Sequence, residues 1–201
     1  MTTCECLGPL IVVAGPSGVG KTTVVSEVLR RDRVPVRRAI TATSRAPRPG
    51  EVPGSDYHFW TVEEFRDAIR QGRMLEYAIV HGSDHYGTPN SEVMPHRQAG
   101  LGAILVIDVQ GAAKVRAVYP CDHLSVFILP PTTEILETRL RSRGSEDEAR
   151  VQKRLATARA ELAEAPAFDH RIVNDDLTTA AEALETLIQD YTRTRSKHHA
   201  G

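Results

Sequence analysis

The feature that most constrains this 201-residue chain is a glycine-rich segment near its start, Gly15-Pro16-Ser17-Gly18-Val19-Gly20-Lys21-Thr22. A glycine, four residues, a second glycine, a lysine and a hydroxyl residue form the phosphate-loop pattern. The segment follows the apolar run Leu10–Ala14 and precedes an expected helix over Lys21–Arg31. Glycines let backbone N–H groups turn toward phosphate oxygens, and a helix N-terminus adds positive potential. The segment therefore predicts a nucleotide-phosphate site, with Lys21 near the β- and γ-phosphates and the Thr22 hydroxyl as a metal ligand for Mg²⁺.

This segment indicates a nucleotide but not a reaction. With all its fixed positions and its context satisfied, a chance glycine-rich turn is a remote alternative. An acidic residue is expected to face the metal from the end of a neighbouring strand. Asp108, which follows the apolar run Ala103–Ile107, is the candidate. The alternative is a simple turn aspartate before Gly111.

The rest of the chain alternates short apolar runs with helical patterns. Further strands are expected over the ranges 37–43, 56–60, 74–80, 103–109, 124–129 and 171–174. Helices are expected over 61–71, from Pro89 to about 100, between Gly111 and Pro120, over 132–143, from Ser145 onward, and along the apolar stripe Ala180, Leu184, Leu187, Ile188 and Tyr191. Thr61 with Glu64, and Ser145 with Glu148, have the spacing of capping boxes. The alternation predicts an α/β fold with a parallel sheet and helices on both faces, built as one domain over 1–201.

Composition excludes several classes of protein. Hydrophobic residues make up 41% and charged residues 25%, as in ordinary soluble domains, and the net charge of −1 gives no basis for a nucleic-acid binder. No signal peptide is evident, and the apolar runs are far shorter than the ~20 residues that span a bilayer. Cys4, Cys6 and Cys121 fit neither zinc nor redox spacing, so we expect reduced thiols and a cytoplasmic location. The oligomeric state stays open, a homo-oligomer included.

A second candidate site lies between Thr41 and Glu51. Arg45 and Arg48 stand three apart on a proline-stiffened stretch and can converge on one phosphate, a task that suits the planar, multi-donor guanidinium. The Asn-Lys-x-Asp pattern by which switch GTPases recognise guanine is not present.

Taken together, these segments resemble the guanylate kinase family, within the nucleoside monophosphate kinases, over about Leu10 to Tyr191. The order and spacing of the matching segments make the resemblance specific. Besides the phosphate loop they are Ser44–Glu51, Leu75–Tyr77, Tyr86–Thr88, Ile107–Gly111, Arg139–Gly144 and Ile172–Leu177.

The resemblance implies a GMP-binding site. Its residues would be Thr41, Arg45, Arg48, Tyr57, Glu76, Tyr86, Thr88 and Asp108. The two arginines would bind the GMP phosphate with the two tyrosine hydroxyls, and Glu76, assisted by Thr41, would recognise guanine. One carboxylate can accept both the ring N1–H and the exocyclic amine of guanine, whereas adenine would leave a buried group unpaired at a cost of about 1–3 kcal/mol. Without the resemblance, the preferred interpretation would be that Glu76 is an exposed strand residue and that Tyr57 and Tyr86 are ordinary, partly buried aromatic residues.

The resemblance also implies an ATP site and a lid. The ATP-binding residues would be the phosphate loop from Gly15 to Thr23 together with Asn174, near the adenine. Lid arginines would supply charge on closure and exclude water, and a basic, solvated helix face is the alternative. The catalytic residues implied are Lys21, Arg45, Arg139, Arg143 and Arg154.

The fold that follows is that of a P-loop nucleoside monophosphate kinase. It would have a core over 8–40, 89–130 and 155–195, a GMP-binding insert over about 41–88, and a mobile lid over about 131–154. The expected reaction transfers the γ-phosphoryl group of Mg·ATP to GMP, giving ADP and GDP, in purine nucleotide metabolism.

Two other functions are weighed against it. A P-loop kinase for another phosphorylated acceptor, such as a ribose bisphosphate, has no use for a guanine-recognising carboxylate such as Glu76. A non-catalytic guanylate-kinase-like module that binds proteins typically loses loop residues, yet Lys21 and Thr22 are intact.

This sequence departs from the family pattern in two places. The stretch between Glu76 and Tyr86 is one residue longer, and Val106 stands where many members carry an acidic residue.

Overall fold

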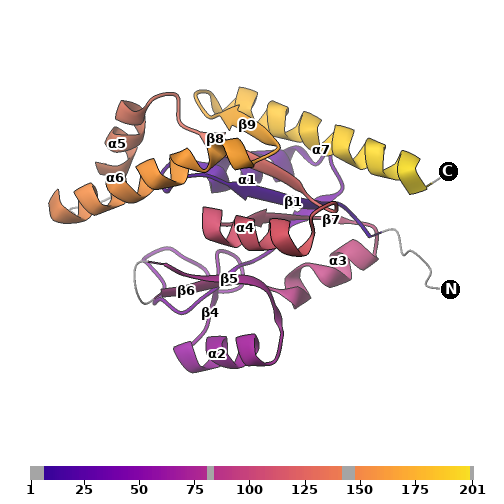
Figure 1. The fold of residues 1–201 in the computed structure, drawn as a ribbon, viewed down its shortest axis with the longest axis horizontal. Helices are drawn as coiled ribbons and strands as arrows, with labels where there is room; N and C mark the ends of the chain where they lie inside the picture. The colour runs from indigo at the N-terminus through magenta and orange to yellow at the C-terminus, as the bar shows by residue number, and fades with distance from the viewer. Residues whose placement is uncertain (1–6, 81–83, 142–147, 200–201) are drawn as a thin grey trace. The chain divides into compact units, whose positions relative to one another are not determined.

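The computed structural model describes residues 7–80, 84–141 and 148–199, which form two compact units (Figure 1). One unit consists of residues 1–12 and 35–123, and the other of residues 13–34 and 124–201. Strand β1, Leu10–Ala14, belongs to both. A five-stranded sheet has the order β2-β7-β1-β8-β9, and a four-stranded sheet has the order β4-β3-β6-β5. The predicted α/β fold with a parallel-sheet core is confirmed.

The first two elements match the sequence prediction residue for residue. Every residue of β1 is buried, as expected for a strand covered on both faces of a parallel sheet. Helix α1, Lys21–Arg31, buries Val24, Val25 and Val28 on one side. Strand, loop and helix follow each other directly, so the glycine-rich segment lies where a buried strand ends and a helix begins.

The second unit is completed by the C-terminal part of the chain, from Leu124 onward. Strands β8 and β9 pair in parallel, and helix α7 packs against α1 and β9 (Figure 1). The buried positions of α7 include Ala180, Leu184 and Ile188 from the predicted stripe. The predicted capping residue Ser145 lies outside the described residues. The elements are β8 Leu124–Leu129, α5 Thr133–Arg141, α6 Glu148–Ala163, the 3-10 helix Ala165–Ala167, β9 His170–Val173 and α7 Leu177–His199.

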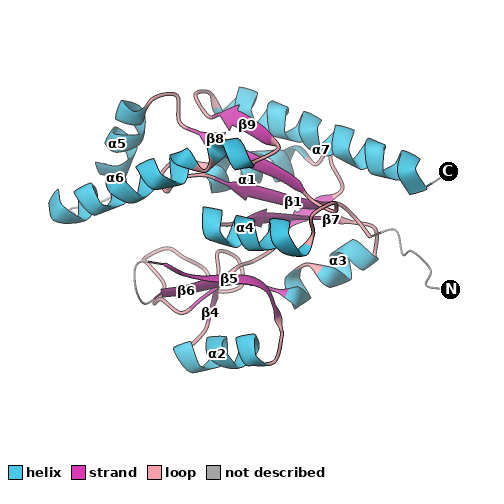
Figure 2. Cartoon of the chain, viewed as in Figure 1, coloured by secondary structure: helices cyan, strands magenta, loops and turns pink. Residues whose placement is uncertain are grey.

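The described residues of the first unit form the four-stranded sheet, two strands of the five-stranded sheet, three α-helices and a 3-10 helix (Figure 2). The predicted capping box is confirmed, because the Thr61 side chain accepts from the Glu64 backbone and the Glu64 carboxylate accepts from the Thr61 backbone. The elements are β2 Val36–Arg38, β3 Ala42–Thr43, β4 His58–Phe59, α2 Val62–Arg70, β5 Met74–Val80, β6 Asp84–Pro89, the 3-10 helix Asn90–Glu92, α3 Met94–Gln98, β7 Gly102–Val106 and α4 Val109–Val118.

Three predictions of elements were wrong. The expected strand over 37–43 is two strands, because β2 pairs in the five-stranded sheet and β3 in the four-stranded sheet. Pro89 does not begin a helix: it ends β6, an unpredicted strand that pairs antiparallel with β5 and β3. Proline is tolerated there because a strand end needs no further backbone donor. The expected strand over 103–109 stops at Val106, because Asp108 is the N-cap of α4 and its side chain accepts from the Gly111 N–H.

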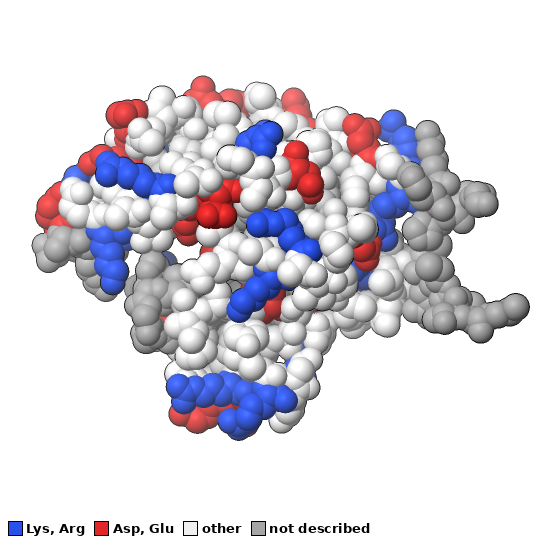
Figure 3. Space-filling model, in the orientation of Figure 1, with Lys and Arg blue, Asp and Glu red and all other residues white. Residues whose placement is uncertain are grey.

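The surface and the helices add little constraint on partners. Basic and acidic side chains are mixed over the face drawn in Figure 3. None of the helices in the described ranges is long and apolar enough to cross a bilayer.

Candidate functional site

The phosphate loop has a backbone shape that excludes larger residues at Gly20. This residue has φ 94° and caps α1. A Cβ atom on Gly20 would lie 2.4 Å from the Asn174 side-chain nitrogen. Both the left-handed backbone and the missing space require glycine here. The N-terminus of α1 thus follows the glycine directly, and a helix N-terminus is a site where backbone N–H groups can bind an anion.

Lys21 curls over the loop that it is predicted to serve. Its ammonium donates to the carbonyls of Gly15 at 2.6 Å and Pro16 at 3.0 Å. The next two side chains, Thr22 and Thr23, are exposed at the first turn of α1. A hydroxyl oxygen in this position suits Mg²⁺, which prefers hard oxygen ligands and shares them with substrate phosphates. Among the described residues no group of three or more His, Cys, Asp or Glu gathers as a metal site.

Asn174 connects the end of β9 to the phosphate loop. Its side-chain amide donates to the Val19 carbonyl at 2.7 Å, and the residue is only 7% exposed. The backbone carbonyl of Asn174 accepts from both terminal nitrogens of Arg139 at 3.4 Å. Sequence analysis did not foresee this supporting contact. The predicted place of Asn174 near the adenine of ATP stays a prediction.

The three predicted lid arginines are placed to different extents. Arg139, on α5, is joined to Asn174 as described. Arg154 is partly buried on α6, and Arg143 lies outside the described residues. Their roles in catalysis therefore stay predictions.

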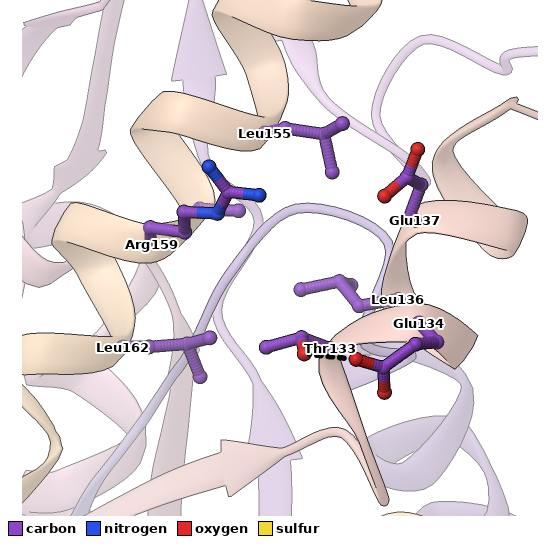
Figure 4. Close-up of a pocket in the computed structure, with 8 residues that line it drawn as sticks. Thr133, Glu134, Leu136, Glu137, Leu155, Arg159 and Leu162 are labelled. Carbon is purple, nitrogen blue, oxygen red and sulfur yellow. Dashed lines mark hydrogen bonds between the residues drawn. The ribbon is translucent and has the colours of Figure 1, made fainter.

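A small cavity lies between α5 and α6 (Figure 4). Leu155, Arg159 and Leu162 of α6 face Thr133 and Leu136 of α5 across it. Its volume of about 70 Å³ is too small for a nucleotide, since ligand pockets are typically about 300–1,000 Å³. None of the predicted site residues lines it.

In the first unit, Arg45 is the centre of a charged and aromatic cluster. Its two terminal nitrogens donate to the Glu51 carboxylate at 2.7 and 2.6 Å, and its Nε donates to the Tyr86 hydroxyl at 2.9 Å. The guanidinium carbon lies 5.0 Å from the centre of the Tyr57 ring. The Arg45 guanidinium holds the pKa of Glu51 below its usual value, and burial raises the pKa of Tyr57. The structure thus brings three predicted phosphate-binding side chains together.

Glu51 is a residue of this site that sequence reasoning missed. Besides binding Arg45, its carboxylate accepts from the Arg48 backbone N–H at 2.7 Å. It therefore fixes both arginine positions, while the Arg48 side chain itself is exposed. The available signal was charge, because Glu51 is the acidic residue in the segment Ser44–Glu51 that carries both arginines.

Glu76 is buried, with 4% of its surface exposed, which excludes the interpretation as an exposed strand residue. One carboxylate oxygen accepts from the Thr88 hydroxyl at 2.7 Å, and the two residues are paired across β5 and β6. Tyr86 and Thr88 are two residues apart on β6, so their side chains lie on one face of the sheet. A single strand thus presents one hydroxyl to Arg45 and another to Glu76.

Burial raises the pKa of Glu76 from its ordinary value of 4.5 to about 7. The Thr88 hydrogen bond acts in the opposite direction, and the negative charge of Asp108 adds to the rise. Asp108 itself accepts from the Gly111 N–H at 2.8 Å, so it caps a helix as well as lying near Glu76. Its predicted role toward metal or guanine stays a prediction.

Two further features of the predicted GMP-binding site are Thr41 and the longer stretch before Tyr86. Thr41 is buried, and its carbonyl accepts from the His58 N–H at 3.0 Å. The extra residue does not prevent the Tyr86 hydroxyl from meeting Arg45. Its immediate surroundings, residues 81–83, lie outside the described ranges.

Comparison with known proteins matches this arrangement to one family. The family model described as guanylate kinase matches residues 8–191. The chain is 47% identical to a guanylate kinase of Gloeobacter violaceus over 183 residues, covering 90% of this chain and 87% of the relative. It is 43% identical to a guanylate kinase of Xanthomonas campestris pv. campestris over 197 residues, covering 96% of each. A crystal structure of guanylate kinase from Anaplasma phagocytophilum superposes with a TM-score of 0.78 at 30% identity, covering 94% of this chain and 88% of that one.

Proposed function

This chain belongs to the guanylate kinase family, and we propose that it transfers the γ-phosphoryl group of ATP to GMP, giving ADP and GDP. The observation that carries this proposal is the face of β6, where Tyr86 contacts an arginine and Thr88 contacts a buried carboxylate. A phosphate-binding group and a base-recognising group on one strand suit a nucleoside monophosphate. A sugar phosphate offers nothing for Glu76 to bind.

In this proposal Glu76 recognises guanine. A carboxylate has lone pairs for about four hydrogen bonds, so the bonds from Thr88 leave capacity for two more donors. The ring N1–H and the exocyclic amine of guanine supply those donors side by side. Adenine would set a ring lone pair against the buried carboxylate, and the resulting unpaired group disfavours AMP.

Arg45 binds the acceptor phosphate. Glu51 holds both terminal nitrogens of Arg45, and this fixes the plane of a guanidinium whose positive charge suits a phosphate. The Tyr86 hydroxyl remains beside it, and Arg48 adds a second positive charge from its exposed position. Thr41 and Asp108 complete the acceptor site.

The donor is held by the phosphate loop. Backbone N–H groups from Gly15 to Thr23 bind the phosphates, Lys21 neutralises the transferring group, and Thr22 is the residue that would hold Mg²⁺. When bound with ATP, Mg²⁺ neutralises charge on the β- and γ-phosphate oxygens. Arg139, Arg143 and Arg154 add positive charge where the transferring oxygens gather negative charge. The reaction belongs to purine nucleotide metabolism, and we place the protein in the cytoplasm, where the free thiol of Cys121 would stay reduced.

The direct test is ADP formation from Mg·ATP with GMP, AMP or ribose 5-phosphate as acceptor, beside a control without acceptor. We expect rapid turnover with GMP alone and none after EDTA removes the metal. Turnover with ribose 5-phosphate, and not with GMP, would show that the acceptor is a sugar phosphate. A folded protein that binds ATP but transfers phosphate to none of these would contradict the enzymatic function.

A pH dependence follows from the pKa of Glu76. Only the ionised carboxylate can accept both guanine donors, so a pKa of about 7 makes kcat/KM for GMP fall as the pH is lowered through neutrality. Between pH 8 and pH 6 the ionised fraction drops about tenfold, and kcat/KM should follow it. The GMP phosphate also titrates in this range, so the Glu76→Gln variant serves as the control. The variant should lose the part of the pH dependence that belongs to the carboxylate, and equal profiles for the two proteins would contradict the assignment.

The same group has an effect of opposite sense on folding. The unfolded chain releases this proton near pH 4.5 and the folded chain near pH 7, so the folded state binds more protons between these values. Stability contributed by this group therefore falls as the pH rises through that interval. Glu76→Gln should remove this contribution, which thermal melts of the two proteins at pH 5 and pH 8 would measure.

A further inference from the structure

Gly111 lies in the first turn of α4. The Glu76 carboxylate occupies the space that a side chain at this position would need. A Cβ atom placed on Gly111 would lie 2.5 Å from the Glu76 Oε2 atom and 3.2 Å from its carboxyl carbon. The next heavy atom, Cδ1 of Ile107, would be at the ordinary contact distance of 3.5 Å. The conflict is therefore with the glutamate alone.

The two oxygens of Glu76 are positioned by different elements. Oε1 accepts from Thr88 on the neighbouring strand, whereas Oε2 occupies the space that a Cβ atom at Gly111 would need. The Gly111 N–H is engaged by Asp108, so it positions the helix start. The orientation of the carboxylate thus depends on a hydrogen bond on one side and on an absent methyl group on the other.

A glycine in a helix needs a reason, because alanine is more favourable there by about 1 kcal/mol. Packing of the fold does not supply it. The obstacle to alanine is the far end of the Glu76 side chain and not the backbone, so a change in the Glu76 rotamer can relieve it. A methyl group at Gly111 would therefore change the direction in which the Glu76 carboxylate points.

We propose that Gly111 is a specificity-determining position of this kinase: its missing side chain leaves the space that lets Glu76 present both oxygens to guanine. Gly111 acts through Glu76 and is a positioning residue, not a group that touches the reacting atoms. This inference rests on the proposed guanine-recognising role of Glu76.

The test is the Gly111→Ala variant. We expect its melting temperature to equal or exceed that of the parent protein, because helix propensity improves. The KM for GMP should rise about 10- to 100-fold, the expected loss when a buried charged group loses its hydrogen-bond geometry. The KM for ATP should not change, since the ATP site belongs to the other unit. Ala113→Gly, at an exposed position of the same helix, is the matched control: it should lower the melting temperature and leave the KM for GMP as it was.

A double-mutant cycle with Glu76→Ala separates this inference from the function on which it rests. If Gly111 acts through the carboxylate, Gly111→Ala has no further effect on the KM for GMP once Glu76 is alanine. An equal rise in both backgrounds, or no rise in the single variant while Glu76→Ala raises the KM, would overturn the role of Gly111 alone. An unchanged KM in Glu76→Ala would overturn the guanine-recognising role of Glu76, and the inference with it.

Discussion

Replacement of Lys21 by alanine is expected to lower kcat for GMP phosphorylation by about 10³-fold or more, the range seen when a cation that stabilises phosphoryl transfer is lost. Such reactions depend on positioning and charge neutralisation, and Lys21 is the cation attached directly to the phosphate loop. Its ammonium donates to the carbonyls of Gly15 and Pro16, which holds it close to the loop.

Because Lys21 also bonds the loop, its loss could act on the fold as well as on the charge. Lys21→Met keeps most of the side-chain length without the ammonium and should be as slow as Lys21→Ala. Single-turnover rates at saturating ATP and GMP, with thermal melts of both variants, distinguish the two effects. A kcat within fivefold of the parent protein in a folded variant would remove Lys21 from catalysis.

The second large effect is expected at Arg45. Arg45→Ala should raise the KM for GMP by about 10²–10³-fold, in line with about 2–5 kcal/mol for losing one partner of a hydrogen-bonded charge pair. Two changes add up. The acceptor phosphate loses a nearby positive charge, and Glu51 is left as a negative charge whose partner is gone.

This second contribution makes a specific comparison available. Adding Glu51→Gln to Arg45→Ala removes the stranded negative charge, so the double variant should bind GMP better than Arg45→Ala alone. By itself, Glu51→Gln should weaken GMP binding, since it loosens Arg45 and the Arg48 backbone. Steady-state KM values for GMP, with the KM for ATP as the internal control, decide the matter. A double variant no better than Arg45→Ala would show that Glu51 exerts no repulsion on the phosphate.

Local signals in the sequence predicted the elements nearest the phosphate loop at their full bounds. Leu10–Ala14 and Lys21–Arg31 are specified by neighbouring residues: an apolar run, a glycine turn and a helical pattern. Thr61 and Glu64 are three residues apart and could likewise be recognised without knowledge of the fold. Where the determinants are local, sequence and structure agree.

Strand β6 was missed because its determinants are not local. Pro89 suits the first turn of a helix as well as the end of a strand, and the choice is made by pairing with β5 and β3. That strand carries Tyr86 and Thr88, which sequence resemblance had marked without showing that they share a face.

The supporting contacts of the site were invisible for a related reason. Glu51 contacts Arg45 only because the irregular segment between them turns back on itself. Gly111 on α4 and Glu76 on β5 are distant in sequence but adjacent in the fold. Asn174 similarly reaches Val19 from the far end of the chain. Sequence resemblance identified the groups expected to contact substrates. The residues that position those groups could be recognised only from their contacts in the folded chain.

The contact between Asn174 and Val19 bears on when each of the two units can be completed during translation. The unit that holds the acceptor site is complete once residue 123 has left the ribosome, whereas the unit that holds the phosphate loop needs residues 124–201. A nascent chain therefore carries the whole glycine-lysine segment long before the amide of Asn174 exists to fix it. We therefore expect the phosphate loop to be fixed by Asn174 only when synthesis of the unit that contains both residues is nearly finished.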